Sequence, residues 1–255
     1  MSGSFDDDGT LVISDGRIIV AVGKKRSGKS ILGKLFFMTY PGDRIVIDVA
    51  GDDGPMGDDV YTITGDVTTL PRRWPENHRK YGPNNEWRPM TVRYVPDAGS
   101  ETFLEDMDHM IGLGLQHGNR EFAAGRVGCC ILVHEIGVVA PDHKTQSHMK
   151  RLLAHNRHNH TTAIFCGPRP QRVDPLVLQQ ADLIYVFEMM NPYDRKRVAE
   201  TIGWDLRTFD DACHELELHE YLRFDANEDK PLPGEDDIRL LHFPPLPEEV
   251  VRKVA

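Results

Sequence analysis

The stretch RIIVAVGKKRSGKSILGKLFF, from Arg17 to Phe37, decides the fold class of this chain. It opens with an apolar run, IIVAV, that has the length and composition of a buried β-strand. A glycine follows directly, and a second glycine stands five residues later, in front of a segment that reads as a helix. Because Gly tolerates the backbone angles of a tight turn, the pattern predicts a strand, a glycine-bounded loop and a helix over residues 29–40.

The eight residues from Gly23 to Ser30 satisfy the pattern GxxxxGK[ST] in full. Between a strand and a helix this pattern predicts a phosphate-binding loop, because backbone N–H groups and the positive end of the helix surround the phosphate. We expect Lys29 to reach the β- and γ-phosphates of ATP and Ser30 to ligate Mg²⁺. The predicted nucleotide-binding residues are Gly23, Lys24, Lys25, Arg26, Ser27, Gly28, Lys29, Ser30 and Ile31.

A carboxylate follows a second apolar strand, in the segment CCILVHE that ends at Glu135. A hydrolysing ATPase places at such a strand end the carboxylate that orients the attacking water, so we predict that Glu135 is catalytic and binds Mg²⁺ through water. The preceding residue, usually an Asp in the Mg²⁺ shell, is His134, and a neutral imidazole adds no negative charge. Either Mg²⁺ is held more weakly or another acid, such as Asp48, assists. An ordinary strand-end carboxylate is the alternative interpretation of Glu135.

Length and composition set broad limits. At 255 residues the chain is long enough to bury a core without disulfide bonds. No apolar run approaches the roughly eighteen residues of a membrane span, and the acidic start, MSGSFDDDG, resembles neither a secretory signal nor a transit peptide. The four cysteines show no CxxC spacing, which indicates reduced, buried thiols. We therefore expect a cytoplasmic protein with no direct membrane insertion.

The net charge of −10 is distributed unevenly and argues against a protein that coats nucleic acid. Residues 205–255 hold fourteen acids against six bases. Residues 143–173 instead hold six bases, five histidines and no acid. This basic band is either a localised anion-facing surface or a solvated helix face that pairs with acids from elsewhere in the fold.

Apolar strands alternate with helical segments along the chain, which predicts an α/β fold with a mostly parallel central sheet flanked by helices on both faces. Ligands of such sheets bind at the carboxyl ends of the strands. The expected strands are IIVAV, RIVIDV, VYTIT, MTVRYV, VGCCILVHE, TTAIFCG and DLIYVFEM, and the expected helices lie at 29–40, from 102, at 145–157 and at 192–202.

Three local signals refine this prediction. Asp15-Gly16 predicts a hairpin turn between TLVIS and RIIVAV. Thr102 and Glu105 form the pattern of a capping box, and Asn191-Pro192 is typical of a helix start. We expect residues 1–204 to form one core with an N-terminal hairpin, and residues 205–255 to form an acidic extension packed on the same domain.

Laid in order, these elements resemble the FtsK/HerA superfamily of P-loop ATPases, from about Ile18 to Gly203. The most specific part is HNRHNHTTAIFCGPRPQRVDPLVLQQADLIYVFEM, residues 155–189. Within it Arg157, Arg169-Pro170, Ala181-Asp182 and Phe187 stand where the family has comparable residues. Because the chain has little room beyond the motor domain, it is most similar to the small genome-packaging ATPases of membrane-containing double-stranded DNA viruses.

The resemblance implies a RecA-like P-loop NTPase that binds ATP and Mg²⁺ and translocates double-stranded DNA. It implies a homo-oligomeric ring, a hexamer in this family, with capsid vertex or portal proteins as further partners. Arg157 is the first candidate for an arginine finger that completes the catalytic site of a neighbouring subunit, and Arg151 and Arg169 are the next. A surface Arg paired with a carboxylate or a phosphate is the other interpretation of Arg157.

The chain departs from the family at one further position. The polar sensor, a Gln at the end of the fourth strand, falls on Pro168, and Gln171 is the nearest substitute. The leading prediction is thus an ATP-driven DNA translocase that packages a viral genome. A HerA-like motor in DNA repair or plasmid transfer, a nucleotide-binding switch or assembly factor with little turnover, and a small-molecule kinase stay open as alternatives.

Overall fold

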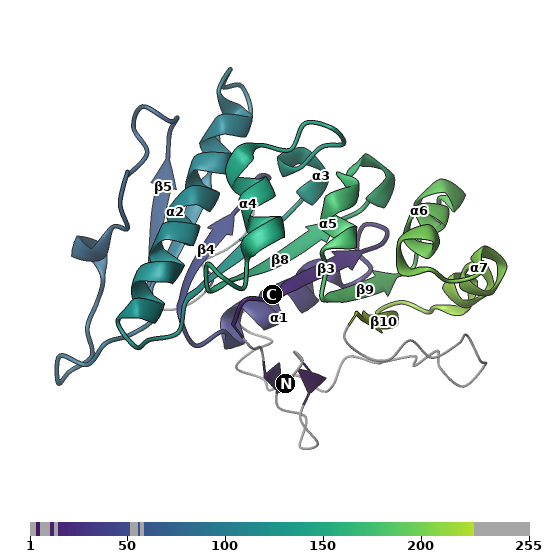
Figure 1. Ribbon diagram of the computed structural model, residues 1–255, viewed down its shortest axis with the longest axis horizontal. Coiled ribbons are helices and arrows are strands. Elements are labelled where there is room, and N and C mark those ends of the chain that lie inside the picture. The colour runs from purple at the N-terminus through teal and green to yellow at the C-terminus, as the bar shows by residue number, and fades with distance from the viewer. Residues whose placement is uncertain (1–3, 6–10, 13–14, 52–55, 57–58, 227–255) are drawn as a thin grey trace.

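The core of the protein is one eight-stranded sheet (Figure 1). The computed structural model describes residues 4–5, 11–12, 15–51, 56 and 59–226. The strand order is β10-β9-β3-β8-β7-β4-β6-β5, and every pairing is parallel except that of β10 with β9. The strands are β3 (Ile18–Val22), β4 (Asp43–Ile47), β5 (Val60–Thr64), β6 (Thr91–Val95), β7 (Cys129–Val133), β8 (Thr161–Gly167), β9 (Leu183–Phe187) and β10 (Tyr221–Asp225).

Helices cover both faces of this sheet, because the strands at its centre are apolar on both sides. On one face, α1 packs against alternate strand residues such as Ile19 and Leu132. On the other face, α2, α4 and α5 pack against the intervening residues, including Val20 and Ile131 (Figure 1). The helices are α1 (Lys29–Thr39), α2 (Phe103–Ala123), α3 (Ile136–Val139), α4 (Ser147–His155), α5 (Pro175–Gln179), α6 (Pro192–Ile202) and α7 (Leu206–Glu215), and short 3-10 turns occupy Glu76–His78 and Pro170–Arg172.

The predicted hairpin around Asp15-Gly16 is wrong. Leu11–Val12 (β2) pairs with Ser4–Phe5 (β1) in a separate two-stranded sheet. Strand β3 lies between β8 and β9, so both of its hydrogen-bonding edges are already occupied by parallel neighbours. Gly16 does turn the chain, with φ of 71°, but the turn leads into the sheet and not to an antiparallel partner.

The predicted capping box at the start of α2 is also absent. Thr102 is the residue before the helix, yet its hydroxyl makes no capping hydrogen bond. It donates instead to Oδ2 of Asp106 over 3.0 Å, and Asp106 is fully buried. The buried carboxylate takes the hydroxyl because an unsatisfied charge there would be costly. By contrast, Asn191 accepts from the backbone N–H of Tyr193 and begins α6 as predicted.

The chain beyond Trp204 adds α7 and the antiparallel edge strand β10 to the same sheet. Residues 227–255, which hold much of the predicted acidic extension, lie outside the described residues. Within the part of the chain that the structure describes, no helix combines the length and apolar composition needed to cross a bilayer.

Candidate active site

The loop between β3 and α1 has the backbone of a phosphate-binding turn. Gly23 and Gly28 have φ of 147° and 110°, values that residues with a Cβ rarely adopt. A Cβ at Gly23 would also lie only 2.6 Å from Cβ of Phe187 on the neighbouring strand β9. The two glycines of the motif are therefore required by backbone conformation, and at Gly23 also by close packing.

Lys29 is the first residue of α1, and its side chain turns back onto the loop. The residue is only 7% exposed, and its Nζ donates to the carbonyl oxygen of Lys24. Burial lowers the pKa of the Lys29 ammonium, and electrostatic interactions with Cys166 and Glu135 partly offset that effect. The Lys29 ammonium thus donates to a neutral backbone carbonyl. Phosphate oxygens can replace that carbonyl, because hydrogen bonds to an ionised acceptor are stronger.

The remaining loop residues divide into buried and accessible groups. Ser27 is buried and donates its hydroxyl to the Lys24 carbonyl over 2.9 Å. Lys25, Arg26 and Ser30 are exposed. The exposed hydroxyl of Ser30, in the first turn of α1, is a hard oxygen ligand of the kind that Mg²⁺ takes together with phosphate oxygens and water.

Glu135 follows β7 directly and has an unusual backbone conformation. Its φ and ψ of 61° and 52° lie in the left-handed region, which costs a residue with a side chain about 1–3 kcal/mol. The side chain is half-buried, and its charge raises the pKa of Lys29, so the two groups are electrostatically coupled. The structure therefore brings the carboxylate of Glu135 to the same edge of the sheet as the phosphate-binding loop.

The two residues that were expected to modify this site differ in their environment. His134 is buried, and its backbone N–H donates to the Ile47 carbonyl on β4. Asp48 is fully buried, and Oδ2 of its carboxylate accepts from Nε of Arg93 over 3.0 Å. Because Arg93 already neutralises Asp48, the structure gives no support to Asp48 as a second acid for Mg²⁺.

The end of β8 carries no side-chain amide toward the loop. Pro168 follows the strand, and Gln171 lies in the short turn at Pro170–Arg172. The Gln171 side chain is exposed, and its backbone N–H donates to Oδ1 of Asp194 over 3.0 Å. The contact to Asp194 fixes the backbone at Gln171, while the side chain makes no hydrogen bond among the described residues.

A cavity of about 290 Å³ lies next to the phosphate-binding loop. The sequence pattern did not single out its outer wall, which comes from the segment between β9 and α6. Glu188 in that segment forms an ion pair with Lys24 and accepts the Lys24 backbone N–H at its carbonyl over 2.7 Å. No short motif signals such a contact, because it joins residues that are far apart in the chain. The cavity is lined by Lys24, Lys25, Pro168, Arg169, Met189, Met190, Asn191 and Asp194.

Arg157 does not belong to this cluster. It lies between α4 and β8, and a Cβ at Gly16 would approach its Cα to 2.8 Å, which places it at the amino end of β3. The phosphate-binding loop follows the carboxyl end of the same strand. Arg157 is therefore at the opposite edge of the sheet from Lys29 and Glu135, with its side chain 63% exposed.

The chain matches no family model and no curated protein, whereas several solved structures share its fold. The genome packaging NTPase B204 from Sulfolobus turreted icosahedral virus 2, solved with AMP, is 19% identical. That match covers 87% of this chain and 99% of the other, with a TM-score of 0.60. VirB4 of Thermoanaerobacter pseudethanolicus is 11% identical over 92% of this chain and 96% of its own, with a TM-score of 0.54.

ATPases 2 and 3 of EssC from Geobacillus thermodenitrificans are 14% identical, with a TM-score of 0.50. That match covers 94% of this chain and 43% of the EssC chain. These likenesses confirm the predicted fold, a RecA-like P-loop NTPase with a mostly parallel sheet between helices. The neighbours are also consistent with the predicted resemblance to FtsK/HerA-type packaging ATPases.

Proposed function

We propose that this protein is an ATPase that couples ATP hydrolysis to the movement of double-stranded DNA, with the packaging of a viral genome as its setting. The observation that carries the proposal is the convergence of a complete phosphate-binding loop with the strained, electrostatically coupled Glu135 at one edge of the sheet. The likeness in fold to the genome packaging NTPase B204, solved with AMP, AMPPCP and ATP-gammaS, supports it.

In this proposal each residue of the site has one task. The backbone from Gly23 to Gly28 surrounds the β-phosphate, and Lys29 exchanges the Lys24 carbonyl for β- and γ-phosphate oxygens. Ser30 and, through water, Glu135 would hold Mg²⁺, which would neutralise charge on the phosphates. Glu135 also orients the attacking water. The cavity beside Lys24 and Lys25 receives the base and ribose, with Met190 as an apolar wall.

Completion of the site by a second subunit explains the position of Arg157. An arginine finger must reach another subunit's nucleotide, and Arg157 is exposed at the edge of the sheet opposite its own loop. A head-to-tail ring brings such opposite edges together, and closure of the ring repeats the contact in every subunit. A hexameric ring around DNA would also repeat every basic side chain that faces the pore, which permits DNA binding despite the net charge of −10.

A nucleotide-binding switch with little turnover is the second candidate function. It is favoured by Pro168 at the end of β8, where no amide is available to sense the γ-phosphate, and by His134 in place of an acid. A motor for DNA repair or plasmid transfer would use the same site residues, and only its partners would distinguish it.

Steady-state ATP hydrolysis with Mg²⁺, with and without long linear double-stranded DNA, tests the proposal. The wild-type rate should rise with DNA, and Lys29→Ala should abolish turnover because it removes the cation that contacts the phosphates. Lys80→Ala, which removes an exposed lysine outside the basic band, is the matched control and should hydrolyse ATP normally. ATP binding without DNA-stimulated hydrolysis would contradict the motor and favour the switch.

A further inference from the structure

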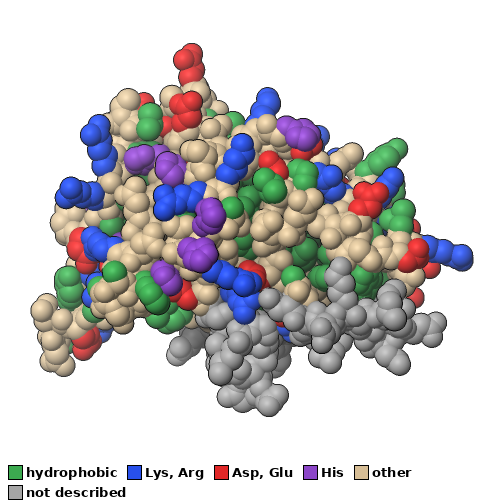
Figure 2. Space-filling model, viewed as in Figure 1, with side chains coloured by type: hydrophobic (Ala, Val, Ile, Leu, Met, Phe, Trp, Pro, Cys, Tyr) green, Lys and Arg blue, Asp and Glu red, His purple; other side chains and the backbone are tan. Residues whose placement is uncertain are grey.

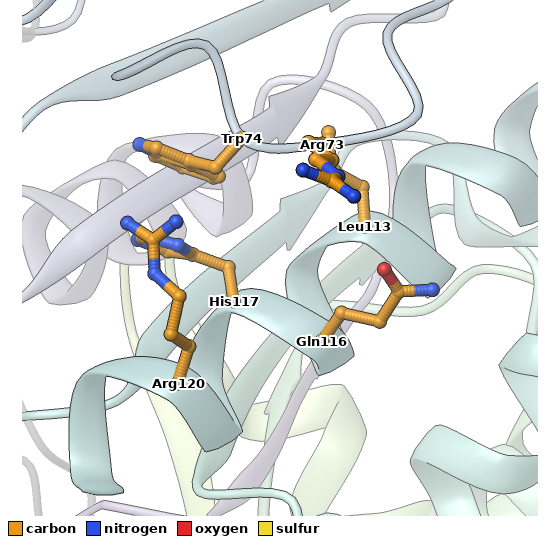
Figure 3. A pocket seen from close by; sticks show the side chains of 6 residues that line it. All are labelled: Arg73, Trp74, Leu113, Gln116, His117 and Arg120. Carbon is orange, nitrogen blue, oxygen red and sulfur yellow. The ribbon is translucent and has the colours of Figure 1, made fainter. Parts of the chain in front are cut away.

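A second polar pocket lies far from the phosphate-binding loop, between α2 and the segment before Pro75 (Figure 3). Its volume is about 320 Å³. In Figure 3 the guanidinium of Arg120, the imidazole of His117 and the indole nitrogen of Trp74 lie together on one side, and Arg73 and Gln116 lie across from them. His117 contacts Asp43, the first residue of β4, so the pocket is at the amino edge of the sheet. The lining residues are Arg73, Trp74, Leu113, Gln116, His117 and Arg120.

The acidic groups around this pocket are already paired with arginines. Asp43 accepts from both Nη atoms of Arg79, over 2.8 and 2.6 Å. Glu76 accepts from Nε of Arg79, and Glu121 from Nε of Arg126, each over 2.5 Å. Asp43 and Glu76 thus share Arg79, and Glu121 has Arg126 bound to it.

This pairing argues against a cation in the pocket. Asp43, His117 and Glu121 offer ligand atoms within 4.8 Å of one another, which is close enough for a metal ion. A metal ion would have to displace Arg79 from Asp43 and Arg126 from Glu121 and leave those guanidinium groups unpaired. The arginines therefore already supply the positive charge that a metal would bring.

Arg73 is the cation of this pocket that remains available. It is exposed and has no ion pair among the residues that the structure describes. Arg120, across the pocket, reaches Oε2 of Glu76 over 3.2 Å and Oε1 of Glu121 over 3.4 Å, and its side chain is 54% exposed. Both guanidinium groups are accessible to a ligand that enters from solvent.

Two deeply buried polar atoms of the pocket lack a partner. Trp74 is 6% exposed and His117 is 2% exposed, and their rings stack with centroids 3.8 Å apart. Nε1 of Trp74 and Nδ1 of His117 make no hydrogen bond in the described structure. Such atoms are rare in folded proteins, because a buried donor without an acceptor costs the full desolvation of that group.

The hydrogen bond to Asp43 assigns the proton of His117. Nε2 lies 2.6 Å from Oδ2 of Asp43, and the pKa of that carboxyl group is held at about 2, so it is ionised near neutral pH and accepts. Nε2 therefore carries a hydrogen, and Nδ1 is either a lone-pair acceptor or, in the imidazolium form, a second donor. When Nδ1 is an acceptor, an anionic ligand that keeps one hydroxyl proton can donate to it. When Nδ1 is a donor, a fully ionised ligand can accept from it.

We propose that this pocket binds a phosphate group. Arg73 and Arg120 supply guanidinium donors, Gln116 supplies an amide donor, and Trp74 and His117 supply the two buried ring nitrogens. Lys, Arg and His side chains gather over α2 and α4 (Figure 2), and such a surface attracts a phosphate. The phosphate belongs either to the backbone of DNA, which rests on the proposed function, or to a free phosphate compound.

The indole N–H signal of Trp74 in ¹⁵N NMR tests the proposal locally. The chain has three tryptophans, and Trp→Phe variants assign their signals. Titration with inorganic phosphate should shift the Trp74 signal saturably, and Arg73→Gln should weaken that binding about tenfold by removing a charge-assisted hydrogen bond. Arg72→Gln, which removes the neighbouring exposed arginine outside the pocket, should leave the titration unchanged. A Trp74 signal that does not move, or moves equally in Arg73→Gln, overturns the proposal.

A second arm uses a short DNA duplex in place of phosphate and identifies the source. Two results together assign the pocket to the DNA backbone. The Trp74 signal shifts with the duplex, and Arg73→Gln lowers the slope of log DNA affinity against log salt concentration by about one, which corresponds to one lost phosphate contact. A shift with phosphate and none with the duplex supports the pocket and assigns it to a free phosphate compound. DNA-stimulated ATP hydrolysis is measured separately. The ATPase assay then tests the proposed function and the NMR titration tests the pocket, so failure of one is distinguishable from failure of the other.

Discussion

Arg157 and Asp182 form an ion pair at the amino edge of the sheet, with Nη2 of the arginine 2.5 Å from Oδ1 of the aspartate. The same carboxylate accepts from Nη1 of Arg17 over 3.1 Å and from the backbone N–H of Ile18 over 2.8 Å. Asp182 therefore keeps partners if Arg157 leaves it. Because the arginine is largely exposed, the pair contributes little to stability, and the guanidinium is available to a neighbouring subunit.

A mixing experiment tests whether Arg157 acts across a subunit contact. Arg157→Ala and Glu135→Gln should each abolish hydrolysis when assembled alone. Equal amounts of the two, assembled together, should recover about a quarter of the wild-type activity, because that share of the contacts joins an intact Glu135 to an intact Arg157. Wild-type subunits co-assembled with Arg157→Ala subunits serve as the reference. They show how far inactive subunits lower the hydrolysis rate of a mixed assembly. No recovery in the mixture, with both variants folded, would rule out the trans role.

Glu135→Gln should separate nucleotide binding from turnover. The amide keeps the size of the side chain but carries no negative charge and cannot accept a proton from water, so we expect hydrolysis to fall by at least about a hundredfold. ATP affinity, measured with a fluorescent analogue, should stay within a few-fold of the wild type. Glu101→Gln, at an exposed position before α2, serves as the matched control. Unchanged turnover in Glu135→Gln would leave Glu135 as an ordinary strand-end carboxylate.

Asp43 should make stability depend on acid. Burial by itself raises the pKa of Asp43, but hydrogen bonds from Arg79, His117 and the Met90 backbone outweigh it and lower the pKa to about 2. A group whose folded pKa is depressed stabilises the fold above its unfolded pKa, near 3.9, and that contribution is lost as the pH falls toward 2.

Asp43→Asn should therefore lower the free energy of unfolding at pH 7 by about 1–3 kcal/mol, because Arg79 and His117 lose their buried carboxylate acceptor and Arg79 keeps only the partly exposed Glu76. The difference from the wild type should shrink as the pH falls from 4 to 2. Urea unfolding at several pH values measures both effects, with the exposed Asp211→Asn as control. A difference that stays constant over this range would contradict the assignment.

Three of the four cysteines, Cys129, Cys130 and Cys213, should be unreactive in the folded protein. All are free and buried, as the sequence predicted. Burial raises the pKa of Cys129 and Cys130, and it raises that of Cys213 to about 12, so thiolate is scarce at pH 8. A thiol reagent should modify these three only after denaturation, whereas Lys144→Cys should add one rapidly reacting thiol. Fast modification of the native wild type would show that the fold opens around these residues.

The sequence alone determined the phosphate-binding loop and the fold class. The motif residues lie between a strand and a helix, and their roles depend on local backbone geometry that consecutive residues determine. These residues are Gly23, Gly28, Lys29 and Ser30. The alternation of apolar strands with helical segments likewise predicted a parallel sheet with both faces covered, because a strand that is buried on both sides must be apolar throughout. Asn191 and Pro192 predicted the start of α6 for the same local reason.

Only the tertiary structure decided which residues meet across the chain. The Asp15-Gly16 turn and the Thr102 cap follow local rules, yet long-range partners overrode both: β8 and β9 occupy the edges of β3, and buried Asp106 takes the Thr102 hydroxyl. The ion pair of Lys24 with Glu188 and the Trp74–His117 pocket join segments that no spacing rule connects. Contacts of this kind depend on strand order and helix packing, which arise from the burial of the whole core and not from any short run of residues.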